Sequence, residues 1–149
     1  MRSRAVLWAM LAVVFFVGGC SHKEKNPTQG IPWLYDIEQG IALAKAQGKP
    51  LMVDFMATWC PPCKAMEDST FSNPEVIRKA AEFIPVRIDV DKQGQVANKY
   101  NANARKYNGV GIPNVLFMTP EEQVLVHPIG YRSPQAFLAV MDSALALCK

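Results

Sequence analysis

Apolar residues recur at helical spacing in several separate stretches of the chain. In the first stretch after the N-terminal segment, this spacing continues until Gly48 and Pro50 end it. Two later helices are expected to begin with a capping residue and a proline, at Asn73–Pro74 and Ser133–Pro134. The pattern predicts helices over residues 36–50, 61–71, 72–83, 93–107 and 133–149.

Four other stretches are short and mostly apolar, which is typical of strands that are buried on both faces. They cover residues 51–57, 83–90, 112–119 and 123–130. Residues 120–122 separate the last two strands and predict a hairpin. Because strands and helices alternate before that hairpin, the sequence predicts an α/β domain with a mixed sheet between helices.

The first 30 residues have a different pattern. Two arginines, 13 uncharged apolar residues and the small residues GGC follow one another, which is typical of a secretory signal peptide. The segment ending at Cys20 resembles the bacterial lipoprotein signal, and Ser21 favours export to the outer membrane. An ordinary cleaved signal is the alternative. We therefore expect a signal peptide at 1–19, a lipidated polar tether at 20–30 and one folded domain at 31–149.

The composition and net charge of the chain argue against a nucleic-acid partner. The chain has 149 residues, of which 50% are hydrophobic, and its formal net charge is +3. Removing Arg2 and Arg4 with the signal lowers this charge to +1. No basic stripe is present, so we expect no nucleic-acid partner. An exported protein works where thiols are oxidised.

Two of the four cysteines, Cys60 and Cys63, are separated by two residues in the segment FMATWCPPCKAM, between a predicted strand and a predicted helix. At a helix N-terminus, unpaired N–H groups and the helix dipole stabilise a thiolate, which is the nucleophile in disulfide exchange. Cys63 lies one turn along the helix and is expected to reach a mixed disulfide formed at Cys60. Pro61 and Pro62 stiffen this turn and provide no backbone donors.

A structural disulfide and a metal site are the alternative explanations of this pair. A disulfide that closes so small a loop constrains the unfolded chain very little. A metal site needs more ligands, and Cys148, His22 and His127 lack ligand spacing. We expect no metal and no cofactor, and we interpret Cys148 as a bystander thiol.

The segment VDFMATWCPPCK resembles the active-site segment of thioredoxins, and the resemblance covers residues 33–147. The segment GIP at 111–113 and Gly130 match further family positions in order. MEDSTFSNPEV, after the motif, resembles a subgroup that includes the C-terminal domain of the membrane thiol:disulfide interchange protein and related exported thioredoxin-like proteins. The resemblance implies a thioredoxin-like fold, with a four- to five-stranded mixed sheet flanked by helices on both faces.

The resemblance also implies roles for individual residues. Asp54 would be a buried carboxylate that takes the proton from Cys63 through water, and burial would raise its pKa. Arg87 occupies the position of a lysine that pairs with this aspartate in thioredoxins, although a solvated charge at the strand end is an equal alternative. Since arginine stays charged, it cannot shuttle a proton.

Substrate contacts follow from the same resemblance. Pro113 would be cis and would place Ile112 beside the cysteines, where an extended substrate segment could pair as an added strand. Trp59, Pro61 and Pro62 would complete the substrate-binding surface. Trp59 is expected to form a lid beside the motif, with a position in the core as the alternative.

These features together predict a monomeric, membrane-anchored oxidoreductase outside the cytoplasm that reduces disulfides of exported proteins. The membrane thiol:disulfide interchange protein is the electron donor that the resemblance implies. One alternative is a disulfide oxidase or isomerase on the same scaffold, because exchange chemistry runs in either direction. Another is a non-enzymatic metal-binding envelope lipoprotein.

Overall fold

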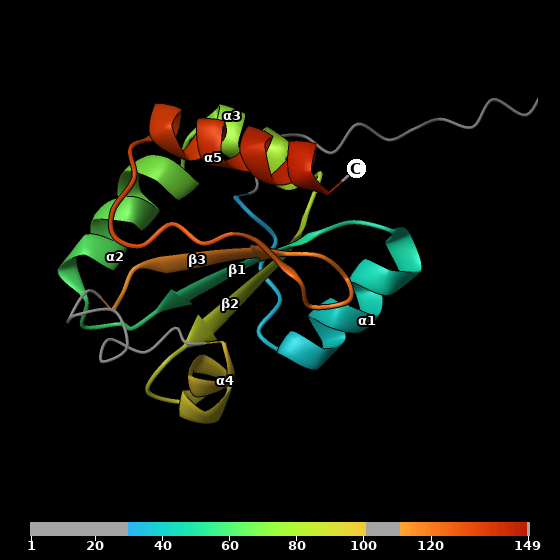
Figure 1. Cartoon of the computed structure of the whole chain (residues 1–149). Helices are drawn as coiled ribbons and strands as arrows, with labels where there is room; N and C mark the ends of the chain where they lie inside the picture. Colours follow the sequence, from blue (N-terminus) through green and yellow to red (C-terminus); the bar gives the residue numbers. More distant parts are fainter. Residues whose placement is uncertain (1–29, 101–110, 149) are drawn as a thin grey trace, which may run out of the picture.

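A computed structural model describes residues 30–100 and 111–148. The predicted signal peptide, Cys20 and the predicted tether up to residue 29 lie outside the described residues. The described part forms a four-stranded mixed sheet between two layers of helices (Figure 1), which confirms the predicted fold class.

The strands pair in the order β2-β1-β3-β4. Their bounds are β1 (Leu51–Met56), β2 (Ile84–Asp89), β3 (Asn114–Met118) and β4 (Val124–Val126). β1 and β2 are parallel, whereas β3 runs antiparallel to both β1 and β4. The predicted hairpin is thus confirmed, although its second strand is shorter than expected. At the outer edge of β2, Leu34 forms an isolated parallel bridge to Val86, where a fifth strand would lie.

The helices lie close to the predicted ranges. They are α1 (Ile37–Gln47), α2 (Pro61–Met66), the π-helix η1 (Glu67–Phe71), α3 (Pro74–Ala80), α4 (Gly94–Lys99) and α5 (Pro134–Leu147). Asn73 and Ser133 cap α3 and α5 with their side chains, as predicted. The range 61–71 is not one α-helix, because its last five residues form the π turn. Of the helix expected at 93–107, residues 101–107 lie outside the described residues.

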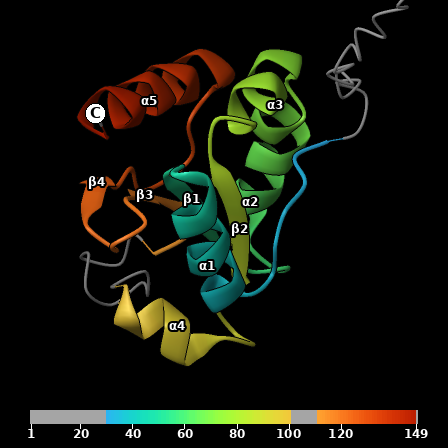
Figure 2. The same ribbon diagram turned by 90° about the vertical axis from the view of Figure 1, so that its right-hand side faces the viewer.

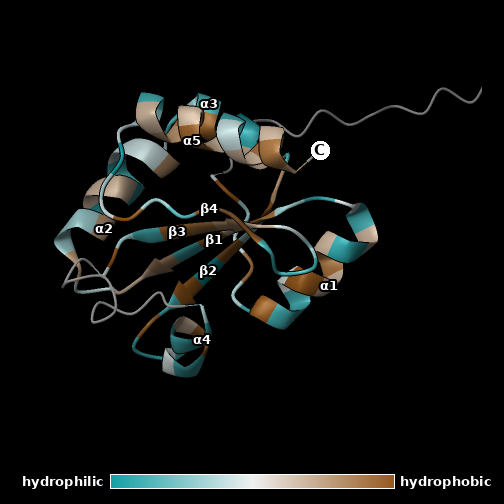
Figure 3. Ribbon diagram, in the orientation of Figure 1, coloured by the Kyte–Doolittle hydropathy of each residue, from teal (hydrophilic) through white to brown (hydrophobic). Residues whose placement is uncertain are grey.

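Each face of the sheet has its own core. On one face, α1 and α4 cover Val53, Phe55, Val86 and Leu116. On the other, η1, α3 and α5 cover a second apolar cluster (Figure 2). Met52, Phe71, Phe83, Val115, Phe117, Phe137 and Met141 belong to that second cluster. In Figure 3, hydrophobic segments lie along the strands of the sheet, and α1 alternates between hydrophobic and hydrophilic residues.

Gly40 lies where α1 packs tightly against β1 and β2. A Cβ atom there would lie 2.5 Å from Cγ2 of Val86, which is closer than carbon atoms can pack. Alanine normally favours a helix over glycine by about 1 kcal/mol. We nevertheless expect Gly40→Ala to lower the free energy of unfolding by about 1–3 kcal/mol, because overpacking must displace the helix or Val86. Urea unfolding monitored by circular dichroism measures this change.

Gly94→Ala is the matched control, because nothing lies within 4 Å of the corresponding Cβ position in α4. That variant is expected to unfold at the wild-type urea concentration or slightly above it. Equal stability of the two alanine variants would contradict the close contact between α1 and β2.

Candidate active site

The two cysteines of the motif lie at the carboxyl end of β1, where the chain turns into α2. Cys60 is the N-cap residue of α2, and Pro61 and Pro62 occupy its first two positions. Since neither proline has an N–H group, Cys63 provides the first backbone donor of the helix. That N–H group points at Sγ of Cys60, with a nitrogen–sulfur distance of 3.2 Å. The sequence therefore places a helix donor and the positive end of the helix dipole at the first sulfur.

Cys60 and Cys63 are joined by a disulfide in this structure, with their Cα atoms 5.3 Å apart. They pack with Ala57 in a small apolar cluster that Met56 and Ile112 border. Cys60 is only 3% exposed and Cys63 7% exposed. Because Cys60 is almost buried, the sulfur of a partner protein can reach it only over the surface that the neighbouring residues form.

That surface is formed by Trp59, Pro61, Pro62 and Ile112, which we call the motif rim. Trp59 is 66% exposed, so the alternative that it fills the core is wrong. Its indole N–H donates to the carboxylate of Asp91, in the turn after β2, and this bond holds the ring outside the core. Pro61 and Pro62 are exposed and Ile112 is half-buried. The rim is thus mostly apolar and open to a partner.

The Ile112–Pro113 peptide bond is cis. It brings the carbonyl oxygen of Ile112 to 3.7 Å from Sγ of Cys60. Gly130 fixes this loop, since its N–H group donates to the carbonyl oxygen of Pro113 over 2.8 Å. Gly130 has a φ of 83°, a left-handed conformation that favours glycine. The second segment of the motif rim is therefore held by the backbone that follows β4.

Asp54 lies on β1 and faces the second core, where it is only 2% exposed. Its Oδ2 accepts a hydrogen bond from Nε of Arg87 over 2.9 Å, whereas its Oδ1 has no partner. Burial raises the pKa of Asp54 to about 6, although the charge of Arg87 opposes this rise. The paired strand position explains the contact, because Asp54 and Arg87 are register partners on β1 and β2. The alternative of a solvated Arg87 is therefore wrong.

Glu67 is a member of this site that the sequence reasoning missed. Its Oε2 lies 2.6 Å from a terminal nitrogen of Arg87, so Arg87 bridges two carboxylates. The guanidinium group also stacks over the ring of Trp33 at 4.2 Å. Glu67 follows Cys63 by four residues, the spacing that places side chains on one helix face, and this spacing could have identified it.

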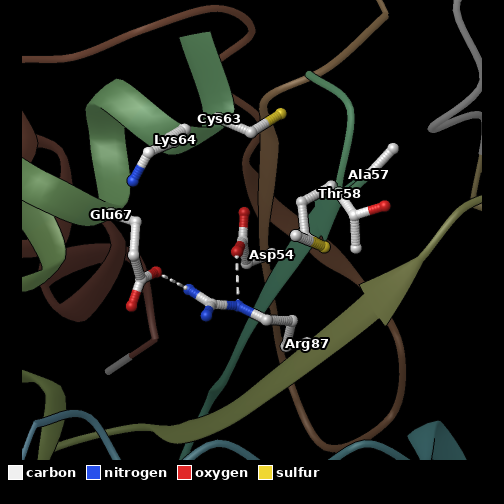
Figure 4. Close-up of a pocket in the computed structure, with 8 residues that line it drawn as sticks. Asp54, Ala57, Thr58, Cys63, Lys64, Glu67 and Arg87 are labelled. Atoms are coloured by element: carbon white, nitrogen blue, oxygen red, sulfur yellow. Dashed lines mark hydrogen bonds and ion pairs between the residues drawn. The ribbon is translucent and has the colours of Figure 1, made fainter. Parts of the chain in front are cut away.

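A pocket of about 220 Å³ connects the carboxylate network to the second cysteine. Its lining includes Asp54, Cys63, Glu67 and Arg87. Figure 4 shows Arg87 between Asp54 and Glu67, with Cys63 on α2 at another side of the same pocket. The volume is large enough for several water molecules. Water in it could carry a proton between Cys63 and the unpartnered oxygen of Asp54.

Two other candidate residues lie apart from this arrangement. His127 pairs through Nε2 with Oδ1 of the buried Asn114, and burial lowers its pKa. Cys148 is a free thiol at the end of α5. Within residues 30–100 and 111–148, no group of three or more His, Cys, Asp or Glu side chains is placed to hold a metal ion.

The model of a family described as thioredoxin-like matches residues 32–120. The chain belongs to the thioredoxin-like family. Within this family it carries the disulfide-bonded cysteine pair, the cis proline and the buried aspartate described above.

Its similar relatives include thiol:disulfide interchange proteins named DsbD. The protein from Yersinia pestis is 30% identical over 130 residues, which cover 86% of this chain and 20% of that protein. The protein from Tatumella citrea is 32% identical over 158 residues, which cover 93% of this chain and 25% of the relative. The thioredoxin-like chain thus spans between a fifth and a quarter of the length of these relatives.

Solved structures are similar over most of the domain. A thioredoxin from Thermus thermophilus has a TM-score of 0.65 and 25% identity, covering 78% of this chain and 88% of that one. The oxidised DsbD C-terminal domain from Neisseria meningitidis has a TM-score of 0.57 and 22% identity, covering 75% and 98%. The similarity to a DsbD C-terminal domain is therefore confirmed at the level of the fold. No helix in the described part of the chain is long and apolar enough to span a membrane.

Proposed function

We propose that this protein is an exported, lipid-anchored thiol:disulfide oxidoreductase that reduces disulfides in other proteins. The observation that carries the proposal is the Cys60–Cys63 disulfide at the start of α2, with a backbone N–H group directed at Sγ of Cys60. Thiolate stabilisation at the first sulfur and a second sulfur within bonding distance are what dithiol–disulfide exchange requires.

The reaction transfers two electrons from the dithiol to the substrate. The Cys60 thiolate attacks one substrate sulfur, and the other substrate sulfur leaves as a thiolate and takes up a proton. Cys63 then loses its proton to Asp54 through water in the shared pocket and attacks Sγ of Cys60. This step releases the second substrate thiol and leaves the Cys60–Cys63 disulfide. A dithiol donor must reduce that disulfide before the next cycle.

Substrate would contact the motif rim. Trp59, Pro61 and Pro62 provide exposed apolar surface, and the cis Pro113 presents the backbone of Ile112 beside Cys60. An extended substrate segment that places its disulfide over Cys60 can pair with this backbone as an added strand. Ile112 resembles the residue at this position in reducing thioredoxins, which favours reduction as the direction.

The location follows from the N-terminal sequence. A signal peptide at 1–19 and a lipid on Cys20, followed by a tether to the domain at 31–149, would hold the protein on the outer side of a bacterial membrane. We assign the reductant to a membrane thiol:disulfide interchange protein, because similar proteins carry that name. The substrates are disulfide-bearing exported proteins, which the protein meets as a monomer.

The Cys63→Ala variant tests this mechanism. Without the resolving sulfur, Cys60 is expected to remain bonded to its substrate, so covalent complexes accumulate on non-reducing gels and disappear with dithiothreitol. Cys148→Ala is the matched control, since Cys148 is the free thiol at the end of α5, and it should form no more complexes than wild type. A Cys63→Ala protein that traps no partner through Cys60 would contradict the proposal.

A further inference from the structure

Trp33 lies directly against the charged group that joins the two carboxylates of the active site. The guanidinium carbon of Arg87 lies 4.2 Å over the centre of its indole ring, and 5.4 Å over the ring of Phe71. An aromatic face attracts a guanidinium group, most strongly when the ring is tryptophan and the group is withdrawn from water. The side chain of Arg87 is only 13% exposed, so water competes little with this contact.

The backbone fixes Trp33 in this place. The N–H group of Leu34 donates to the carbonyl oxygen of Pro85 over 2.9 Å, and its carbonyl oxygen accepts from the N–H group of Arg87 over 2.7 Å. Leu34 packs on the first apolar cluster and Trp33 on the second, so Trp33 points to the face of the sheet that carries Arg87. The indole ring also meets the buried Phe71 in an edge-to-face contact, with ring centres 5.2 Å apart. Trp33 is therefore held both through the backbone and through its ring.

The stacked geometry leaves the edges of the guanidinium group to the two carboxylates. Nε of Arg87 donates to Asp54 over 2.9 Å, and a terminal nitrogen donates to Glu67 over 2.6 Å. The N–H bonds of a guanidinium group lie in its plane, whereas a stacked ring covers a face of that plane. The two kinds of contact do not compete, so Trp33 can hold the group without displacing either carboxylate.

Without the indole ring, the two carboxylates would not hold Arg87 equally well. The side chain of Asp54 is 2% exposed, whereas that of Glu67 is 51% exposed. An arginine side chain has many rotamers when nothing restricts it. A released guanidinium group can keep Glu67 at the surface, where water also solvates it, and leave the buried Asp54. The stacking contact therefore favours the buried partner.

The charges around Asp54 determine what such a displacement would do. Burial raises the pKa of Asp54, Arg87 from β2 lowers it through its charge and its hydrogen bond, and Glu67 from η1 raises it. Lys64 from α2 also lines the pocket, but its ammonium group pairs with Asp68 over 3.0 Å. Movement of Arg87 away from Asp54 would remove the influence that lowers this pKa, so Asp54 would ionise at a higher pH.

We infer that Trp33 is a positioning residue: by stacking on Arg87, it holds the guanidinium group at the buried carboxylate of Asp54 and so sets the pH at which that carboxylate ionises. Trp33 does not line the pocket that Asp54 shares with Cys63, so it acts through Arg87. The consequence for catalysis rests on the proposed function, in which Asp54 takes the proton of Cys63.

The ionisation of Asp54 in the oxidised full chain tests this inference without any substrate. We expect Trp33→Leu, which keeps an apolar side chain but removes the aromatic face, to raise the midpoint of the titration by about one pH unit. Trp33→Phe keeps a smaller aromatic face and should lie between this variant and wild type. Tyr35→Leu is the matched control, because Tyr35 is an aromatic residue of the same segment that is 66% exposed, and it should titrate like wild type. Carbon-13 NMR of the Asp54 carboxyl group measures all four proteins.

Two results would overturn the inference. An unchanged Asp54 midpoint in Trp33→Leu, whatever its stability to urea, would mean that Trp33 only fills space. A shift that persists when Trp33→Leu is made in an Arg87→Gln background would mean that Trp33 does not act through Arg87, since that background lacks the guanidinium group. We expect no further shift there. Should Trp33→Leu fail to fold, Trp33→Phe takes its place in both comparisons, and the same two results would overturn the inference.

Kinetics separate this inference from the proposed function. In stopped-flow exchange with a disulfide peptide, Trp33→Leu should resolve the mixed disulfide about five-fold more slowly than wild type at pH 6, because less Asp54 is ionised. The two rates should agree at pH 9, where Asp54 is ionised in both proteins. A shifted NMR titration with an unchanged rate profile would refute the base that the proposed function assigns, while it would still support the placement of Arg87 by Trp33.

Discussion

Replacing Cys60 with alanine is expected to abolish disulfide reduction, lowering the rate by roughly 10³-fold or more. Cys60 is the sulfur that faces the motif rim and the carbonyl oxygen of Ile112, and it accepts the first N–H group of α2. Cys63 cannot substitute for it. Its side chain lies one turn into the helix and lines the pocket shared with Asp54, and its own N–H group points at the other sulfur.

Insulin reduction with dithiothreitol as the terminal reductant measures this loss. Cys148→Ala controls for the removal of a thiol elsewhere and should keep the wild-type rate. The circular dichroism spectrum of Cys60→Ala should match that of wild type reduced by dithiothreitol, which separates loss of chemistry from loss of fold. If Cys60→Ala stayed active while Cys63→Ala lost all activity, the two cysteines would have to exchange roles.

Local signals in the sequence were enough for most of the framework. Helix starts at Asn73–Pro74 and Ser133–Pro134 depend on capping atoms within three residues, so the sequence alone predicts them. The buried strand before Cys60 is recognisable because its residues are nearly all apolar, as expected of a strand that is covered on both faces. The motif adds its own start signal for α2. Each of these features is set by residues that are close together in the sequence.

Contacts between distant segments were not predictable in the same way. The antiparallel pairing of β3 with β1 joins residues about sixty positions apart, and the exposed position of Trp59 depends on Asp91, 32 residues away. The π turn at η1 has no sequence signature that we could use. Arg87 could be placed only by resemblance. The spacing from Cys63 could have identified Glu67 as a member of the site, but its ion pair with Arg87 depends on how the two strands and the helix assemble.

The buried aspartate links the stability of the fold to its chemistry. Asp54 has one unpartnered oxygen in a site that is nearly closed to solvent, and its pKa is raised from the usual 3.8 to about 6. An acid whose pKa is raised by folding stabilises the native state below the unfolded pKa and loses that contribution as the pH rises through the folded one. Ionised Asp54 therefore costs the native state about 3 kcal/mol at neutral pH and above.

Asp54→Asn is expected to remove this cost. The amide keeps the shape of the side chain and can still accept the hydrogen bond from Arg87, but it does not ionise. The free energy of unfolding should exceed that of wild type by up to about 3 kcal/mol at pH 8, and the difference should shrink below pH 6 and vanish below about pH 3. Urea unfolding at a series of pH values measures it. Asp142→Asn is the matched control, since Asp142 lies in an exposed ion pair with Lys79 and should change stability by less than about 1 kcal/mol.

The same variant is expected to resolve mixed disulfides about 10²-fold more slowly, because it removes the base that accepts the proton of Cys63. In wild type, the rate should rise with pH through about 6 as Asp54 ionises, and this rise should be absent in Asp54→Asn. Stopped-flow exchange with a disulfide peptide gives both profiles. A variant that is less stable than wild type at pH 8, or that keeps the wild-type pH profile, would show that Asp54 is only a structural partner of Arg87. A gain in stability together with a loss of rate would mean that this fold holds an unfavourable ionised carboxylate because its reaction requires a base beside the second sulfur.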